Sequence, residues 1–168
     1  MQPEDAGASP LPSGRFEGRE AFRELVRAAL AQAAAQGWRE IVLCDASFAD
    51  WPLGERAVAQ SLQAWSKTGR RFVMMARRYD DVAVMHARFV TWRRTWSHIV
   101  ECWGCASADP QDFPSALCGP GWVARRLDLE RSTGISGAEP QRRILLREEL
   151  AEWQRRSSPA FPATTLGL

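Results

Sequence analysis

The sequence predicts an α/β fold in which helices flank a mostly parallel sheet. Three short runs, REIVLCD at 39–45, RFVMMA at 71–76 and HIVECW at 98–103, have the continuous hydrophobicity of strands that are buried on both faces. Longer amphipathic segments separate these runs. Such alternation is typical of right-handed crossover connections, which leave successive strands parallel.

The helices are predicted from apolar residues that recur at helical spacing. Segment 19–36 is apolar on one face and is followed by Gly37, a common helix stop, and segment 54–67 ends before Gly69. Segment 80–96 begins with two aspartates, which the helix dipole favours at this end. We expect its buried stripe to consist of Val82, Met85, Phe89, Trp92 and Trp96.

The C-terminal third of the chain has a different character. Residues 106–121 are rich in Pro, Gly, Asp and Ser and are predicted to form a long surface loop. The alternation at 122–129 and the turn residues and short strand at 131–137 predict a strand pair that closes the sheet. A last helix follows at 140–156, and the terminal FPATTLGL is apolar enough to pack on the body.

The predicted domain organisation is a mobile leader at 1–14 followed by a single α/β domain at 15–168. The leader consists mainly of Pro, Ser, Gly and Ala, which cannot build a core. A chain of 168 residues buries roughly 70% of its unfolded surface and needs no metal or disulfide to do so. The N-terminus lacks the pattern of a signal peptide, and no apolar stretch approaches a membrane span, so we expect a cytoplasmic protein with no membrane partner.

The charge balance disfavours nucleic acid as a partner. The 22 basic and 20 acidic residues give a net charge of +2, which is too small a field to indicate nucleic acid or a membrane surface. Lys67 is the single lysine, and we attribute the arginine-rich composition to a GC-rich bacterial genome. Arginines do interleave with tryptophans at 92–96, which leaves weak single-stranded nucleic-acid binding as an alternative.

Polar residues that follow the predicted strands form a candidate site. In open parallel sheets, ligands bind outside the carboxyl ends of the strands. We expect an anionic small molecule there, and we expect Arg77 or Arg78 to contact Asp45, Asp80 or Asp81. The same residues could instead be an ion-pair cluster that caps the third helix. The candidate ligand-binding residues are Asp45, Ser47, Trp51, Arg77, Arg78, Asp80 and Trp103.

The cysteines and histidines are interpreted as structural. Cys102 and Cys105 form a CxxC, but the chain has no second pair at zinc-finger spacing, so we expect ordinary reduced thiols, no metal and no cofactor. The two histidines, His86 and His98, are interpreted as edge-of-core or surface residues. The sequence contains no GxSxG, HExxH, GxxxxGK[ST] or dinucleotide-binding motif.

The order of these elements resembles one half of the phospholipase D-like fold. The resemblance rests on IVLCDASFADWPLGE, RRFVMMARRYDDV, HARFVTWRRTWSHIVEC and RSTGISG, and from about Phe16 onward it extends to uncharacterised bacterial proteins with a degenerate version of that half. In the active family a His-x-Lys pair supplies the nucleophile and the phosphate contact. Residues 117–129 contain neither His nor Lys. The resemblance therefore implies a fold, and a homodimer of half-modules, without the catalytic residues.

Together these features predict a non-catalytic cytoplasmic binding or regulatory module. The alternatives are an enzyme that acts on a phosphate ester through Asp45, Arg77 and Arg78, and a weak binder of single-stranded nucleic acid.

Overall fold

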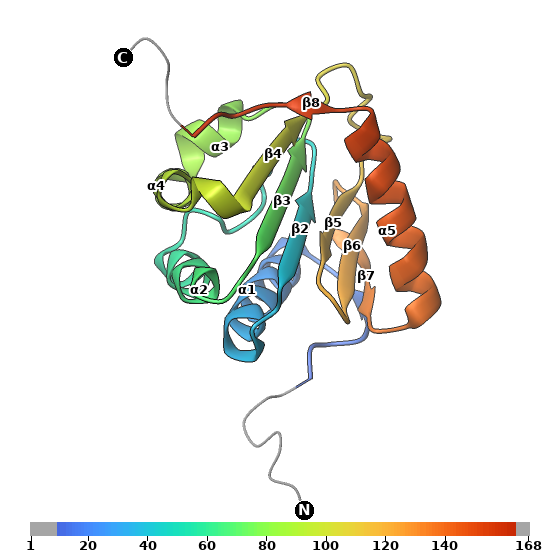
Figure 1. The fold of residues 1–168 in the computed structure, drawn as a ribbon. Coiled ribbons are helices and arrows are strands. Elements are labelled where there is room, and N and C mark those ends of the chain that lie inside the picture. The colour runs from blue at the N-terminus through green and yellow to red at the C-terminus, as the bar shows by residue number, and fades with distance from the viewer. Residues whose placement is uncertain (1–9, 164–168) are drawn as a thin grey trace, which may run out of the picture.

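A computed structural model describes residues 10–163 and contains one open sheet of eight strands (Figure 1). The strand order is β1-β7-β6-β5-β2-β3-β4-β8. The strands are β1 (Gly14–Phe16), β2 (Glu40–Cys44), β3 (Arg71–Ala76), β4 (Val100–Gly104), β5 (Ser115–Cys118), β6 (Val123–Asp128), β7 (Thr133–Gly137) and β8 (Ser158–Pro159). The α-helices are α1 (Arg19–Gln36), α2 (Arg56–Ser66), α3 (Asp80–Met85), α4 (Ala87–Thr95) and α5 (Pro140–Arg155), and a 3-10 turn occupies Ser97–Ile99.

The fold is mixed α/β, but the expectation of a mostly parallel sheet is wrong. Only β2, β3 and β4 pair in parallel, and the other neighbouring strands are antiparallel. Helices connect β2, β3 and β4, as the sequence predicts. The strands β5, β6 and β7 instead follow one another through short turns, which can only join antiparallel neighbours.

Strand β5 lies inside the segment that we expected to be a surface loop. All four of its residues are buried, and Ala116 is paired with Cys44 of β2. The Pro, Gly and Asp residues on either side dominate the composition of 106–121 and conceal the short run SALC, which has three apolar residues. The predicted strand pair at 122–137 is confirmed as β6 and β7, and β5 joins this pair to the parallel strands.

Side chains from the two faces of the sheet form two separate cores. Helices α1, α2 and α4 cover one face and α5 covers the other (Figure 1). Alternation along the strands assigns Ile41 and Leu43 to the first core and Val42 and Cys44 to the second. The predicted helices at 19–36 and 140–156 are confirmed within one residue.

The predicted helix at 80–96 is interrupted at His86, which separates α3 from α4. The His86 backbone has φ −120° and ψ 59°, and its Nε2 lies 2.8 Å from the carbonyl oxygen of Phe48. This contact draws the side chain into the core, where it is 4% exposed. Met85, which we expected in the buried stripe, is 51% exposed because the interruption rotates α3 away from the stripe of α4.

Both described ends of the chain contact the body. The Pro12 carbonyl accepts hydrogen bonds from Trp122 Nε1 and Ser136 Oγ, so residues 10–14 of the expected leader lie against β6 and β7, and residues 1–9 lie outside the described residues. At the other end Phe161 stacks on Tyr79 with ring centroids 4.9 Å apart. Residues 164–168 of the terminal FPATTLGL also lie outside the described part. Within 10–163, no helix is both long enough and apolar enough to cross a membrane.

Candidate functional site

Asp45 occupies the carboxyl end of β2, as the sequence predicts, and it organises the loop that follows. Its Oδ2 accepts hydrogen bonds from the backbone N–H groups of Ser47 at 3.2 Å and Phe48 at 2.8 Å. Such a side-chain-to-backbone turn is typical of Asp at the start of a loop. The turn places Phe48 at φ 62°, a strained value for a non-glycine residue, and its ring is fully buried.

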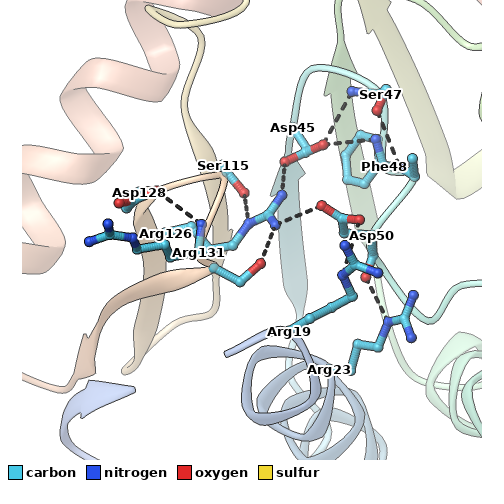
Figure 2. Close-up of polar contacts among 12 residues, drawn as sticks. Arg19, Arg23, Asp45, Ser47, Phe48, Asp50, Ser115, Arg126, Asp128 and Arg131 are labelled. Carbon is cyan, nitrogen blue, oxygen red and sulfur yellow. Dashed lines mark hydrogen bonds and ion pairs between the residues drawn. The ribbon is translucent and has the colours of Figure 1, made fainter. Parts of the chain in front are cut away.

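The other oxygen of Asp45 is bound by Arg126 of β6, a residue that the sequence analysis did not single out. Figure 2 shows the Arg126 guanidinium surrounded by partners from three other segments of the chain. Its Nη2 lies 2.8 Å from Asp45 Oδ1, and its Nη1 lies 3.1 Å from Asp50 Oδ2. Hydroxyl groups complete the shell, because Nε donates to Ser115 Oγ at 2.9 Å and Nη1 to Ser132 Oγ at 3.0 Å.

This cluster is buried and its groups are engaged with one another. The side chains of Arg126 and Asp45 are 3% and 5% exposed, and the guanidinium carbon lies 4.6 Å from the centre of the Phe22 ring. Both oxygens of Asp45 are thus bound by groups of the protein, Oδ2 by two backbone N–H groups and Oδ1 by Arg126. The arrangement joins β2, β5, β6 and the loop after β2, and it therefore favours a structural role for Asp45.

Arg126 could not be placed from the sequence for a specific reason. It follows Arg125 directly, and neighbouring residues on a strand point to opposite faces, so the sequence does not say which arginine faces inward. Strand β5 was not predicted, so the sequence did not show that Ser115 pairs with Arg126 and brings it beside Asp45. The run SALC between Pro114 and Gly119 is the signal that could have revealed this strand.

The expected contact between the Arg77–Arg78 pair and an acid is not formed. The Arg77 guanidinium donates to the carbonyl oxygens of Ala108 at 2.5 Å and Ala106 at 3.3 Å, so it holds the loop after β4. Within residues 10–163, neither arginine forms an ion pair with Asp45, Asp80 or Asp81. Arg78 and Asp80 are exposed at the surface.

The two tryptophans proposed for a ligand have different environments. Trp51 is 1% exposed and packs edge-on against Phe22 at 5.1 Å and Phe48 at 4.9 Å between ring centroids, so its assignment as a ligand-facing side chain is wrong. Neighbouring Ser47 accepts a hydrogen bond from the Ala49 N–H, within the loop. Trp103 is half-buried, and its Nε1 donates to Glu101 Oε1 at 3.3 Å.

The CxxC residues belong to different cores, although they lie close in sequence. Cys102 packs on the α1–α2–α4 side and Cys105 on the α5 side, and both are free thiols. Burial raises the pKa of Cys102 to about 11, and it also raises the pKa values of Cys44 and Cys118. In the described part of the chain, no group of three or more His, Cys, Asp or Glu side chains has the arrangement of a metal site.

A groove with a basic rim, the α2–α4 groove, runs between these two helices. Its cavity measures about 540 Å³, and Arg56, Lys67 and Arg88 are its charged lining residues. Arg88 is held in place by a hydrogen bond from Nη1 to the Gly54 carbonyl at 2.8 Å. In the described structure no acidic side chain lines this groove. Its other lining residues are Ala59, Gln60, Gln63, Ala64, Thr91, Trp92 and Thr95.

The small net charge of the chain conceals an uneven distribution of charge along the sequence. The segment from Arg56 to Val100 contains nine basic residues and two acidic ones, Asp80 and Asp81, and is flanked by Glu55 and Glu101. This segment includes α2 and α4, so the acids that balance the total charge lie mostly on other elements. Trp96, half-buried after α4, donates from Nε1 to Gln63 Oε1 at 3.0 Å and so stands beside the groove.

The comparisons with known proteins identify a structural neighbour without identifying a family. No family model matches the chain, and no curated protein matches its sequence. An archaeal chromatin protein, TrmBL2, whose structure is described as showing a novel mode of DNA binding, superposes with a TM-score of 0.67 at 12% sequence identity. The match covers 93% of this chain and 57% of TrmBL2, so this chain spans little more than half of that protein. At this identity the likeness concerns the fold alone.

Proposed function

We propose that this protein is a non-catalytic cytoplasmic binding module whose α2–α4 groove holds the phosphate backbone of single-stranded nucleic acid. The observation that carries the proposal is a groove with three cationic side chains and no acidic lining residue in the described structure. The amides of Gln60 and Gln63 and the hydroxyl of Thr91 add uncharged hydrogen-bond donors along it.

An aromatic side chain beside the groove favours single-stranded over duplex nucleic acid as the ligand. Binding of single strands combines cations with an aromatic ring on which a base can stack. Trp92 in the groove floor is 4% exposed and its Nε1 is bound to Ser66, so it packs in the core instead. Trp96 is half-buried and bound to the groove residue Gln63, which makes it the ring available for one base.

The DNA-binding description of TrmBL2 agrees with this proposal but does not carry it. A phosphate-ester enzyme is less well supported, because both oxygens of Asp45 are bound by other groups and Arg77 is bound to loop carbonyls. An expectation of sequence-independent binding follows, since contacts from Arg and Lys to phosphate carry no base information.

The proposal is tested by the anisotropy of a fluorescent oligo-dT strand titrated with protein at several salt concentrations. Three phosphate contacts predict that log K falls with log[salt] at a slope of about −2, so affinity drops about 16-fold between 50 and 200 mM salt. A matched duplex is expected to bind more weakly. Absence of binding at 50 mM salt, or a slope near zero, would contradict the proposal.

Charge-removing variants localise the binding. Replacing the three rim residues together (Arg56→Gln, Lys67→Gln, Arg88→Gln) is expected to weaken binding at least tenfold and to flatten the salt slope. The control is Arg155→Gln, which removes an exposed charge from α5 on the other side of the sheet. Equal losses of affinity in the triple variant and in the control would show that the phosphates are bound outside the α2–α4 groove.

Two expectations from the resemblance remain proposals. The alternation of helices with the parallel strands β2, β3 and β4 supports a degenerate half of the phospholipase D-like fold. A homodimer, as that resemblance implies, is best placed on the exposed apolar side chains of β6 and α5, and light scattering measures it directly. These side chains are Leu127, Ile144 and Leu145, which are 68%, 56% and 58% exposed.

A further inference from the structure

Arg93, on α4, is a buried cation without an acidic partner. It is 7% exposed, and its Nε donates to the Phe161 carbonyl at 3.2 Å. Its Nη1 is buried and has no hydrogen-bond partner. Among residues 10–163, no carboxylate lies within ion-pair distance of it.

This situation is unusual because arginine keeps its charge in every protein environment. Buried arginines are therefore almost always paired with an acid. Arg126 follows this rule, since its guanidinium is equally buried and is bound by Asp45 and Asp50. The contrast indicates that Arg93 has room for an anion that residues 10–163 do not provide.

Arg93 lines a cavity of about 460 Å³ at the edge of the sheet, beside β4 and β8. A volume of this size suits a small organic molecule. The strand β8 pairs with Trp103 and Gly104 of β4, and the pairing along this side of β4 ends at Cys102, whose carbonyl accepts a hydrogen bond from the Ala160 N–H at 2.9 Å. The walls are mainly apolar and consist of Val100, Cys102, Trp103, Pro159, Ala160 and Pro162.

Glu101 also lines the cavity, but its carboxylate is already occupied. Arg71 binds both of its oxygens, at 2.8 and 3.2 Å, and Trp103 Nε1 donates to one of them. The bond to Arg71 lowers the pKa of Glu101, so this group stays ionised and paired. Arg93 is thus the charge in the cavity wall that remains available to a ligand.

We propose that this cavity binds a small organic carboxylate with an apolar body. The carboxylate pairs with the guanidinium of Arg93, and the apolar body packs against Trp103 and the prolines of the β8 segment. The site is separate from the α2–α4 groove, and the bound carboxylate is not chemically altered there. Cys102 is a protonated thiol at neutral pH, because burial raises its pKa to about 11.

The first experiment compares charged and neutral ligands on the wild-type protein. Benzoate, 3-phenylpropionate and octanoate are titrated in parallel with their neutral amides, and acetate tests the need for an apolar body. The readouts are calorimetry and the Trp103 indole N–H resonance, assigned with Trp103→Phe. At least one of the three carboxylates is expected to shift this resonance and to bind at least tenfold more tightly than its amide and than acetate. Equal binding of acid and amide, or no shift with any of the three at 10 mM, overturns the proposal.

The second experiment uses adjacent arginines as a matched pair. Arg93→Met keeps the side-chain volume and removes the charge, whereas Arg94→Met removes the same charge from an exposed position on the same helix. Carboxylate binding is expected to fall at least tenfold in the first variant and to be unchanged in the second. Unchanged binding in Arg93→Met, or the same loss in both, contradicts the assignment. If Arg93→Met does not fold, the comparison of acids with amides on the wild-type protein still tests whether the cavity prefers carboxylates.

Discussion

Arg126 and its partners contribute to stability in a way that the partly exposed ion pairs of the same protein do not. Its guanidinium is 3% exposed and is bound by the buried carboxylate of Asp45, by two hydroxyls and by Asp50, which is itself 33% exposed. Arg125, the preceding residue, forms a bidentate ion pair with Glu149, but these two side chains are 31% and 36% exposed. Solvent weakens the second pair, whereas removal of Arg126 leaves Asp45 buried without its counter-charge.

Arg126→Gln is therefore expected to lower the free energy of unfolding by about 3–5 kcal/mol, and Arg125→Gln by less than about 1 kcal/mol. Urea unfolding followed by circular dichroism measures both values. Because the two substitutions are identical and adjacent, the difference between them isolates the effect of burial. Similar losses in the two variants would show that the buried cluster contributes no more than a surface pair.

At the scale of elements, the antiparallel half of the sheet depends on a close approach of β1, β6 and β7 at Gly134. A Cβ at this position would collide with the Arg125 carbonyl and would lie 2.6 Å from the Phe16 ring and 2.8 Å from Arg126 Cα. Glycine in the interior of a strand commonly marks such an approach. Backbone atoms of a paired strand cannot move aside without loss of the ladder.

Gly134→Ala is expected to destabilise the protein by at least about 2 kcal/mol, because it overpacks this contact. Gly121→Ala, at a position where a Cβ meets nothing within 4 Å, is the control and should change stability by less than about 0.5 kcal/mol. Thermal unfolding of both variants provides the measurement. A neutral Gly134→Ala would mean that β6 and β7 do not approach this closely in solution.

For the molecule as a whole, the titratable groups whose pKa values are shifted define the pH range of greatest stability. Burial raises the pKa values of Cys44, Cys102 and Tyr79. These groups lose their protons more readily when unfolded, so they stabilise the fold at low and neutral pH and this contribution declines above about pH 9. Glu55 and Glu101 have pKa values that are lowered by their arginine partners. The stabilisation that these two ion pairs contribute is present above about pH 4.5 and is lost as the pH falls through the folded pKa values.

The free energy of unfolding is accordingly expected to be highest between about pH 5 and pH 9 and to fall on both sides. Urea titrations across this range test the expectation. Cys102→Ser should reduce the alkaline decline, since serine does not ionise in this range. A stability that rises above pH 9 would contradict the burial of these thiols.

Elements whose signal is local were predictable from the amino-acid sequence. Helix α1 and strand β3 lie where periodicity and continuous apolar character predict them, because both depend on residues close together in the chain. The position of Asp45 at the end of β2 was predictable for the same reason. The break at His86 was not, because it depends on a contact with Phe48, which is far away in the sequence.

Which residues share a site depends on contacts between distant segments of the chain. Strand β5 brings Ser115 and Arg126 beside Asp45, and a four-residue strand between Pro and Gly gives too short a pattern to predict this pairing. Net charge likewise carries no information on where the charges lie, so the basic α2–α4 groove and the unpaired Arg93 became visible only once the helices were packed. The physical reason is the same in each case: pairing and burial are contacts between distant segments, whereas a sequence pattern reports the preferences of neighbours.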